Sequence, residues 1–235
     1  TLFPYEYTDA TEFFIPGNTY FIRVQPKRNG EVYGNPSNME EYRVETVVYT
    51  IAISKSDLED SIPIIDLDPV KEGIDYTLEI YEDLEASSMI ADVADITLFP
   101  YKFEEGLEIF VPGITYYFKI FPFKDGEMYG VSSNLGIFNI EAVVYTLTVT
   151  ASEIDDAIPI IGLEPIKSGV EYTVFIFEDS EGSNIIAELP SISTFPYEFT
   201  EGIDLLFPGN MYYIQIQPNR NGEVYGFPSN LETFN

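Results

Sequence analysis

The chain has 235 residues, of which 45% are apolar, so it is long enough for one large globular domain or for two to three small ones. It has no cysteine and no histidine, which excludes disulfides, thiolate catalysis and zinc–cysteine sites and removes the commonest general base. Its net charge of −29 repels phosphates and anionic lipid, so we expect it to bind no nucleic acid and to favour cations. No apolar run approaches the roughly 18 residues of a membrane-spanning helix, so we expect no membrane insertion in this segment.

A long internal repeat organises the sequence. The segment FIPGNTYFIRVQPKRNGEVYG at residues 14–34 returns at 110–130 and at 206–226, each time after 96 residues. The same offset aligns IPIIDLDPVKEGIDYTLEIYED from Ile62 with IPIIGLEPIKSGVEYTVFIFED from Ile158. Because the offset persists without a gap, the repeating unit is a whole domain of about a hundred residues rather than a small solenoid motif.

Strand-like alternation of apolar and polar residues recurs along each repeat. In chain order it predicts strands at 19–26 (TYFIRVQP), 49–54 (YTIAIS) and 74–81 (IDYTLEIY), with equivalents one repeat later. Turn signals separate them, such as Pro16-Gly17, Asn29-Gly30 and Lys71-Glu72-Gly73. No segment has a convincing helical period. Several short strands closed by such turns predict an all-β sandwich.

The stretch FIPGNTYFIRV resembles the corner between strands E and F of fibronectin type III domains. Its features are an apolar residue, then Pro-Gly, then a tyrosine, then alternating apolar positions. The resemblance implies tandem fibronectin type III-like, seven-stranded β-sandwiches arranged end to end, as in bacterial-type extracellular and surface proteins. It makes Tyr20, Tyr116 and Tyr212 the corner tyrosines, whose hydroxyls bond to the backbone a few residues upstream. The chain departs from the family in having Ile64-Ile65 and Ile160-Ile161 in place of the usual strand B tryptophan.

The resemblance also implies the domain boundaries. Residues 45–140 and 141–235 are two complete domains, and residues 1–44 hold only strands E, F and G of a third. We therefore expect the chain to be part of a longer tandem array. The linkers YRVETVVYT and FNIEAVVYT have no glycine, proline or serine run, so they limit swivelling between neighbours. At about 3.3 Å per strand residue, each domain is expected to add roughly 30 Å to a stiff rod.

Acidic residues recur in two clusters per repeat, which the resemblance places at one pole of each sandwich. Calcium binds six to eight oxygen ligands from irregular loops, so a calcium site is one interpretation, although no EF-hand spacing is present. Solvated acidic loops are the alternative, with no cofactor at all. The candidate metal ligands are Asp57, Glu59, Asp60, Glu82, Asp83, Glu85, Glu153, Asp155, Asp156, Glu178, Asp179 and Glu181.

Basic residues show the opposite bias. Six of the eleven lie in the loops that the resemblance places at the other pole, namely Lys27, Arg28, Lys71, Lys124, Lys167 and Arg220. Neighbouring repeats stacked head to tail would then bring unlike charges together, and exposed pairs of about 0.2 to 1 kcal/mol would orient the neighbours more than hold them. Ordinary loop composition is the alternative interpretation.

Aromatic side chains are expected on the outer face of the sheet formed by strands C, F and G. Such a stripe can bind sugar rings or a neighbouring chain, or its members can form cross-strand pairs that only stabilise the sheet. The candidates for a ligand or lateral contact are Phe21, Tyr81, Tyr117, Phe121, Phe175, Phe177 and Tyr213.

No catalytic motif is present, since the sequence has no nucleophile elbow, phosphate-binding glycine loop or HExxH helix. We therefore predict a non-catalytic structural segment of an extracellular or cell-surface stalk, adhesin or filament protein, acting as a stiff spacer. Two alternatives are a module that binds a glycan or surface protein through its aromatic stripe, and the accessory domains of a carbohydrate-active enzyme. A further hypothesis is a filament in which strands of another copy complete residues 1–44.

Overall fold

The structure is a computed structural model that describes residues 4–7, 13–57, 61–207 and 209–235. The chain divides into two compact units. The first comprises residues 1–56, 63–103 and 116–138, and the second comprises residues 57–62, 104–115 and 139–235. The domain boundaries expected after residues 44 and 140 stay predictions.

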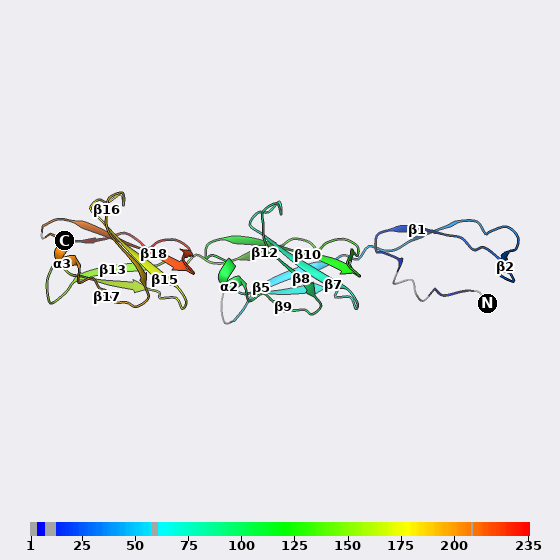
Figure 1. Cartoon of the computed structure of the whole chain (residues 1–235), viewed down its shortest axis with the longest axis horizontal. Coiled ribbons are helices and arrows are strands. Elements are labelled where there is room, and N and C mark those ends of the chain that lie inside the picture. Colours follow the sequence, from blue (N-terminus) through cyan, green and yellow to red (C-terminus); the bar gives the residue numbers. More distant parts are fainter. Residues whose placement is uncertain (1–3, 8–12, 58–60, 208) are drawn as a thin grey trace. The chain divides into compact units, whose positions relative to one another are not determined.

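The sandwich of residues 141–235 lies wholly within the second unit (Figure 1). Its first sheet has the order β13 (Thr146–Ala151), β14 (Pro159–Glu164), β17 (Tyr197–Glu198). Its second sheet has the order β16 (Ile185–Ile192), β15 (Glu171–Phe177), β18 (Tyr212–Arg220), β19 (Glu223–Val224), and β20 (Glu232–Phe234) also pairs with β18. All of these pairings are antiparallel.

Alternation along the strands builds the core of this sandwich. On β18, Tyr212, Ile214 and Ile216 are buried, whereas Tyr213 and Gln215 between them are half-buried. Both sheets contribute to one apolar cluster that includes Leu147, Ile161, Leu163, Tyr172, Val174, Ile176, Phe199, Ile214, Ile216 and Phe234. A fully buried side chain of this kind stabilises the fold by about 1.5 to 3 kcal/mol, so the inward face of each strand holds the two sheets together.

The same elements occur one repeat earlier. One sheet has the order β5 (Thr50–Lys55), β6 (Pro63–Asp68), β9 (Tyr101–Lys102). The other has the order β8 (Met89–Ile96), β7 (Asp75–Tyr81), β10 (Thr115–Lys124), β11 (Glu127–Met128), and β12 (Gly136–Asn139) also pairs with β10. Each of these strands lies 96 residues before its counterpart, to within a residue at the ends. The predicted all-β, fibronectin type III-like sandwich architecture is confirmed by this strand order.

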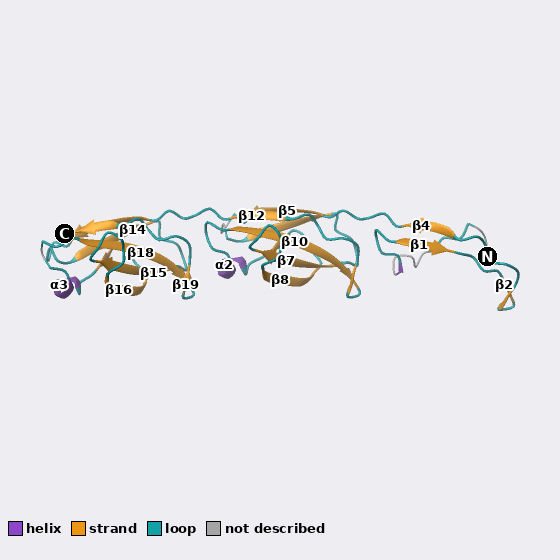
Figure 2. Ribbon diagram, turned by 90° about the horizontal axis from the view of Figure 1, so that it is seen from above, coloured by secondary structure: helices purple, strands orange, loops and turns teal. Residues whose placement is uncertain are grey.

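Two one-turn helices, α2 (Gly106–Ile109) and α3 (Gly202–Leu205), were not predicted (Figure 2). A single turn is too short to show a 3.6-residue period, so the sequence pattern does not reveal it. Each turn begins with a glycine that packs against the backbone of the loop before β6 or β14. A Cβ at Gly106 would lie 2.5 Å from the Ser61 carbonyl oxygen, and one at Gly202 would lie 2.7 Å from the Ala157 carbonyl oxygen.

A serine–asparagine pair just before β20 forms hydrogen bonds to both sheets of the sandwich. Ser229 Oγ accepts a hydrogen bond from Ile216 N at 2.9 Å and donates one to the Asn230 carbonyl oxygen at 2.8 Å. Asn230 Oδ1 accepts a bond from Leu147 N at 2.7 Å, and Leu147 belongs to the other sheet. The same bonds to Ser Oγ and Asn Oδ1 recur 96 residues earlier, so they are part of the repeating design.

Residues 13–44 contain two separate two-stranded sheets. Strand β1 (Thr19–Ile22) pairs with β4 (Glu40–Arg43), and β2 (Lys27–Arg28) pairs with β3 (Glu31–Val32). Ile22 and Val24 are 44% and 49% exposed here, whereas their equivalents Phe118 and Ile120 are fully buried. The face that forms the core in the later repeats is therefore open in this part of the chain.

Candidate functional site

Tyrosine side chains that point into the core, half-buried at Tyr20 and buried at Tyr212, hold loops at the ends of the repeats. Tyr20 OH accepts a hydrogen bond from Ile15 N at 2.8 Å, and Tyr212 OH accepts one from Phe207 N at 2.8 Å. Both bonds span the Pro-Gly corner that the resemblance to fibronectin type III domains places between strands E and F. Tyr116, the corner tyrosine of the middle repeat, is 1% exposed.

A second tyrosine holds the turn that resembles the passage between strands B and C. Tyr76 OH accepts a bond from Lys71 N at 2.8 Å, and Tyr172 OH accepts one from Lys167 N at 2.9 Å. The Pro-Gly corner and this turn are therefore both braced from inside the core, and they present fixed surfaces to whatever they contact.

The hairpin at the Asn-Gly or Asp-Gly sequence has the same geometry in all three repeats. Its two turn residues both have positive φ, at 53° and 86° for Asn29-Gly30 and at 52° and 82° for Asn221-Gly222. This is the backbone of a tight two-residue hairpin, which explains the Asn-Gly and Asp-Gly sequences. Tyr33 N, Tyr129 N and Tyr225 N each donate to a proline carbonyl oxygen at 2.9 Å. A tyrosine followed by glycine thus stands at the same place on each hairpin.

Residues from the ends of successive repeats meet at two places, which we call the first and second joints. The first joint lies within the first unit, where a Cβ on Gly130 would lie 3.5 Å from Pro16 Cβ. A groove beside it is lined by linker residues and by three side chains of the following repeat, Lys71, Lys124 and Tyr129.

The second joint lies within the second unit and is the more tightly packed. A Cβ on Gly226 would lie 3.8 Å from Pro112 Cβ, and the Phe227 ring lies so close to Gly113 that a Cβ there would be 2.6 Å from it. Ser61 Oγ and Tyr225 OH are 3.3 Å apart within hydrogen-bonding distance, and the two residues are only 1% and 6% exposed.

Cationic side chains border the second joint as well. The Arg220 guanidinium lies over the Tyr225 ring at 4.0 Å. Lys167, Arg220 and Glu141 line the cavity of about 40 Å³ that remains between the contacting residues.

The two joints use equivalent residues, each pair separated by 96 positions. The pairs are Pro16 and Pro112, Glu45 and Glu141, Val47 and Val143, Lys71 and Lys167, Lys124 and Arg220, Tyr129 and Tyr225, Gly130 and Gly226. The approach of the hairpin glycine to the corner proline and the residues that line the space beside it therefore return with the period of the sequence, whereas the Phe227 contact is particular to the second joint, because its equivalent Val131 is 45% exposed.

Two core tyrosines next to the linkers have buried hydroxyl groups. Tyr49 and Tyr145 are 1% and 3% exposed, and among the described residues neither hydroxyl has a hydrogen-bond partner. Burial, and then the neighbouring Tyr76 or Tyr172, raises the pKa of each phenol well above its usual value. Each ring packs edge-on against that neighbour at 5.8 Å between centroids.

The predicted acidic clusters do not gather into a metal site in the part of the chain that is described, where no group of three or more carboxylates is placed to hold an ion. Asp83 and Asp179 instead close their own loops. Asp179 Oδ1 accepts bonds from Glu181 N at 2.9 Å and Ser183 N at 3.0 Å, and Asp83 accepts equivalent bonds from Ser87 and Ser88.

These backbone hydrogen bonds, led by those from Ser87 and Ser183, hold the pKa of both aspartates below the usual value. Of the other candidate ligands, Asp155 Oδ1 accepts a bond from Ala157 N at 2.8 Å. Glu59 and Asp60 lie outside the described residues, and Asp57, Glu82, Glu85, Glu153, Asp156, Glu178 and Glu181 lie in surface loops.

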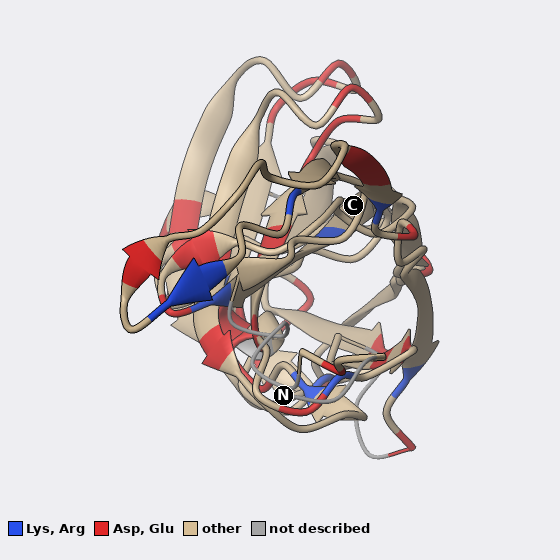
Figure 3. Ribbon diagram, turned by 90° about the vertical axis from the view of Figure 1, so that its right-hand side faces the viewer, with Lys and Arg blue, Asp and Glu red and all other residues tan. Residues whose placement is uncertain are grey.

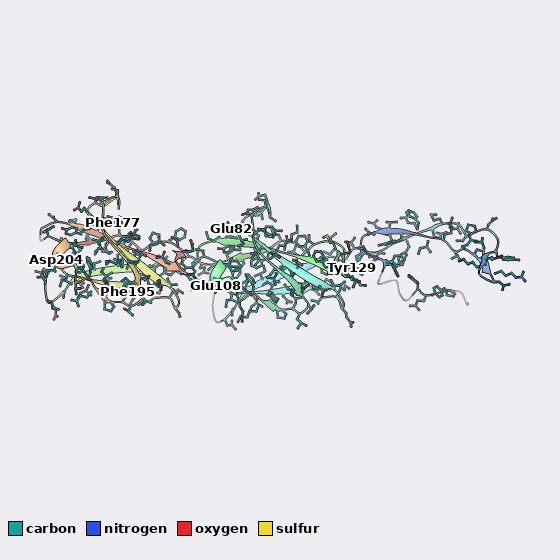
Figure 4. The ribbon with its side chains drawn as sticks, in the orientation of Figure 1. Glu82, Glu108, Tyr129, Phe177, Phe195 and Asp204 are labelled. Atoms are coloured by element: carbon teal, nitrogen blue, oxygen red, sulfur yellow. The ribbon has the colours of Figure 1, made fainter. Side chains whose placement is uncertain are left out.

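The predicted aromatic stripe is less exposed than expected. The expectation was wrong for Tyr81 and Phe177, which are 7% and 5% exposed. The loop after each strand folds back, closed by Glu82 N to Ser88 O and by Glu178 N to Asn184 O, and a Cβ on Gly182 would touch the Phe177 ring at 3.7 Å (Figure 4).

The other aromatic candidates divide between covered and open positions. Tyr117 pairs across the strands with Tyr81, and Tyr213 pairs with Phe177. The half-buried candidates are Tyr117, Phe121, Phe175 and Tyr213. Phe21 alone of the seven is exposed, at 64%. The burial therefore favours cross-strand pairs that stabilise the sheet.

Sequence reasoning missed Ser61, Gly113, Tyr225 and Phe227 as joint residues. The signal available was the Tyr-Gly pair that ends each copy of the long repeated segment, and nothing in a single repeat says what that pair contacts.

Comparisons with known proteins identify no family. No family model matches the chain, and no curated protein matches it. Among solved structures, the FN1–FN3 domains of chicken CNTN1 are 17% identical, with a TM-score of 0.29, over 93% of this chain and 77% of that one. The chicken interferon gamma receptor alpha chain is 12% identical, with a TM-score of 0.33, over 80% of this chain and 98% of that one. At these scores the fold assignment rests on strand order and register alone. In the described ranges, neither α2 nor α3 nor any other helix has the length and apolarity needed to cross a bilayer.

Proposed function

We propose that the chain is a non-catalytic, extracellular or cell-surface spacer whose stiffness comes from the joints between successive repeats. The observation that carries the proposal is that the glycine of a Tyr-Gly hairpin lies against the proline of a Pro-Gly corner at both joints, Gly130 against Pro16 and Gly226 against Pro112. A spacer needs resistance to bending rather than a reactive site, and the chain has neither histidine nor cysteine for one.

Stiffness follows from how the joints are made. At the first joint the Pro-Gly corner is held by the hydrogen bond from Ile15 N to Tyr20 OH, and the hairpins of both joints are held by bonds from Tyr129 N and Tyr225 N to proline carbonyl oxygens. Buried contacts such as that of Ser61 with Tyr225 must be broken for the second joint to bend. Short apolar linkers leave little slack for such bending. Binding of a glycan through the sheet aromatics is the weaker candidate, because most of those rings are covered by their neighbours.

Amide ¹⁵N relaxation of the whole chain tests the proposal. Repeats joined stiffly tumble as one elongated body, so the relaxation rates of both sandwiches are expected to fit a single anisotropic diffusion tensor. Phe227→Ala removes the ring packed on Gly113 and is expected to loosen the second joint, whereas Phe21→Ala is a matched control on an exposed ring away from it. Separate, nearly isotropic tumbling times for the two sandwiches of the unaltered chain would contradict the proposal.

A further inference from the structure

An open groove of about 880 Å³ lies on the side of the last sandwich, next to the start of β17. Residues of β13 and β14 line one part of it, and Phe195, which is labelled in Figure 4, lines another together with Pro196. All of the lining residues lie between positions 144 and 196 and within the second unit. Ligand pockets measure about 300 to 1,000 Å³, so the groove has room for a short peptide.

The groove follows the edge of β14 at the point where its neighbour on that side stops. Strand β17 pairs only with Ile160 and Ile161. The residue that precedes β17 is Pro196, which has no N–H to donate to a sheet. In the described part of the chain, β14 therefore continues past Ile161 without a strand on this side.

Leu163 points its backbone N–H and C=O toward this open edge. Its partner on β13 is Leu147, whose N–H donates to Asn230 Oδ1 rather than to β14. Antiparallel pairs alternate between bonded and non-bonded, so the Leu147–Leu163 pair has no ladder hydrogen bonds and the polar groups of Leu163 face away from β13. Among the described residues, no backbone group bonds to Leu163 from the other side.

The middle repeat closes the same edge with a side chain. Leu67, the equivalent of Leu163, donates its N–H to Asp66 Oδ1 at 2.9 Å. In the last repeat Gly162 replaces Asp66, so the carboxylate that covers this N–H is missing. A charged side chain on a strand edge hinders pairing with a further strand, so its replacement by glycine opens the edge.

A second substitution accompanies the first. A Cβ on Gly162 would lie 2.5 Å from Thr148 Oγ1, so Thr148 leaves no room for a side chain opposite it. The equivalent pair in the middle repeat is Ala52 opposite Asp66, where the smaller residue accommodates the carboxylate. Both members of the pair differ together, and the open edge is therefore specific to the last sandwich.

The lining of the groove indicates what kind of segment it accepts. Val144 and Ile166 are 80% and 49% exposed, and Glu164 is the one charged residue in the lining. The whole chain carries a charge of −29, with acidic residues on strands and loops alike (Figure 3). A second copy is repelled by this charge, whereas a basic segment is attracted.

We propose that the groove binds an extended, apolar segment of another protein that carries a lysine or arginine, by adding it to the open edge of β14 as a short strand. Leu163 pairs with the backbone of the segment, Val144, Ile166 and Phe195 contact its apolar side chains, and Glu164 meets its cation. The site goes beyond the spacer function, because it gives the last repeat a partner that the middle repeat excludes.

Fluorescence anisotropy of a labelled pentapeptide, Val-Thr-Val-Lys-Val with both ends capped, tests the proposal when the full chain is added up to about 1 mM. We expect saturable binding and a shift of the Leu163 amide signal in ¹H–¹⁵N spectra. Thr148→Ala combined with Gly162→Asp copies the middle repeat and is expected to weaken binding about tenfold or more. The reverse pair, Ala52→Thr with Asp66→Gly, should create a second site and double the peptide bound at saturation.

Two altered peptides separate the contributions to binding. The peptide methylated on each backbone nitrogen has no donor for the Leu163 carbonyl oxygen and is expected to lose binding. The peptide with glutamate in place of lysine should bind about two- to fivefold more weakly.

Absence of binding at the highest concentration would overturn the proposal, as would equal binding by the variant that carries Asp at position 162. Concentration-dependent shifts of the Leu163 amide without any peptide would assign the groove to a second copy of the chain and would also overturn it. The relaxation test of joint stiffness is independent of each of these results.

Discussion

Tyr145→Phe should stabilise the protein although it removes a polar group from a well-packed core. The Tyr145 hydroxyl is buried and has no partner among the described residues. A buried donor without a partner costs about 1 to 3 kcal/mol of desolvation, and removing the hydroxyl recovers this free energy. The substitution also leaves a small void, which offsets part of the gain. We therefore expect the free energy of unfolding to rise by about 1 kcal/mol, or about 2–4 °C in melting temperature for a chain of this length.

Tyr172, which packs edge-on against Tyr145, provides a matched control. Tyr172 OH accepts a hydrogen bond from Lys167 N at 2.9 Å, so Tyr172→Phe deletes the same atom but also removes a hydrogen bond that holds the turn at Lys167. We expect it to lower the free energy of unfolding by about 1 kcal/mol. Thermal unfolding followed by circular dichroism measures both variants. Equal destabilisation by the two changes would refute the reasoning, because it would mean that the Tyr145 hydroxyl forms a bond that the structure does not contain.

Three further predictions concern buried groups elsewhere in the sandwiches. Burial raises the pKa of Tyr49 and Tyr145, so the folded state keeps protons that the unfolded state releases above pH about 10. The free energy of unfolding should therefore fall above that pH, by up to about 1.4 kcal/mol per pH unit for each tyrosine. Urea midpoints measured at increasing pH should show a smaller fall in Tyr145→Phe. Asn230→Ala removes the acceptor of Leu147 N and should cost about 1 to 3 kcal/mol by urea unfolding, whereas an unchanged midpoint would mean that the bond contributes nothing. Gly202→Ala places a Cβ 2.7 Å from a backbone oxygen and should cost about 1 to 3 kcal/mol by urea unfolding, whereas an unchanged midpoint would mean that the backbone around Ala157 yields without cost.

The sequence was sufficient for the architecture because a strand with one buried face leaves a period of two in its residue pattern. Alternation along 115–124 and 212–220 predicts which residues face the core, and the structure buries Tyr116, Phe118 and Ile120 accordingly. The Asn-Gly pairs likewise predict tight hairpins, since both turn residues need positive φ.

Features that depend on contacts between segments were not predictable in the same way. Phe177 has the strand position of an exposed residue, yet the loop closed by Asp179 covers it. The joint was also hidden, because whether Tyr225 is a surface residue or a buried one depends on the repeat before it. The unpaired hydroxyls of Tyr49 and Tyr145 leave no mark in a pattern of apolar and polar residues.

The central claim is that joints fix the repeats relative to one another, and a distance between two spin labels tests it most directly. The chain has no cysteine, so labels can be placed at Asp92→Cys and Glu188→Cys, which are exposed and equivalent positions on β8 and β16. Pulsed electron paramagnetic resonance should give one narrow distance distribution that broadens when Phe227→Ala is added. A broad distribution in the chain with an intact joint, unchanged by that substitution, would contradict the account.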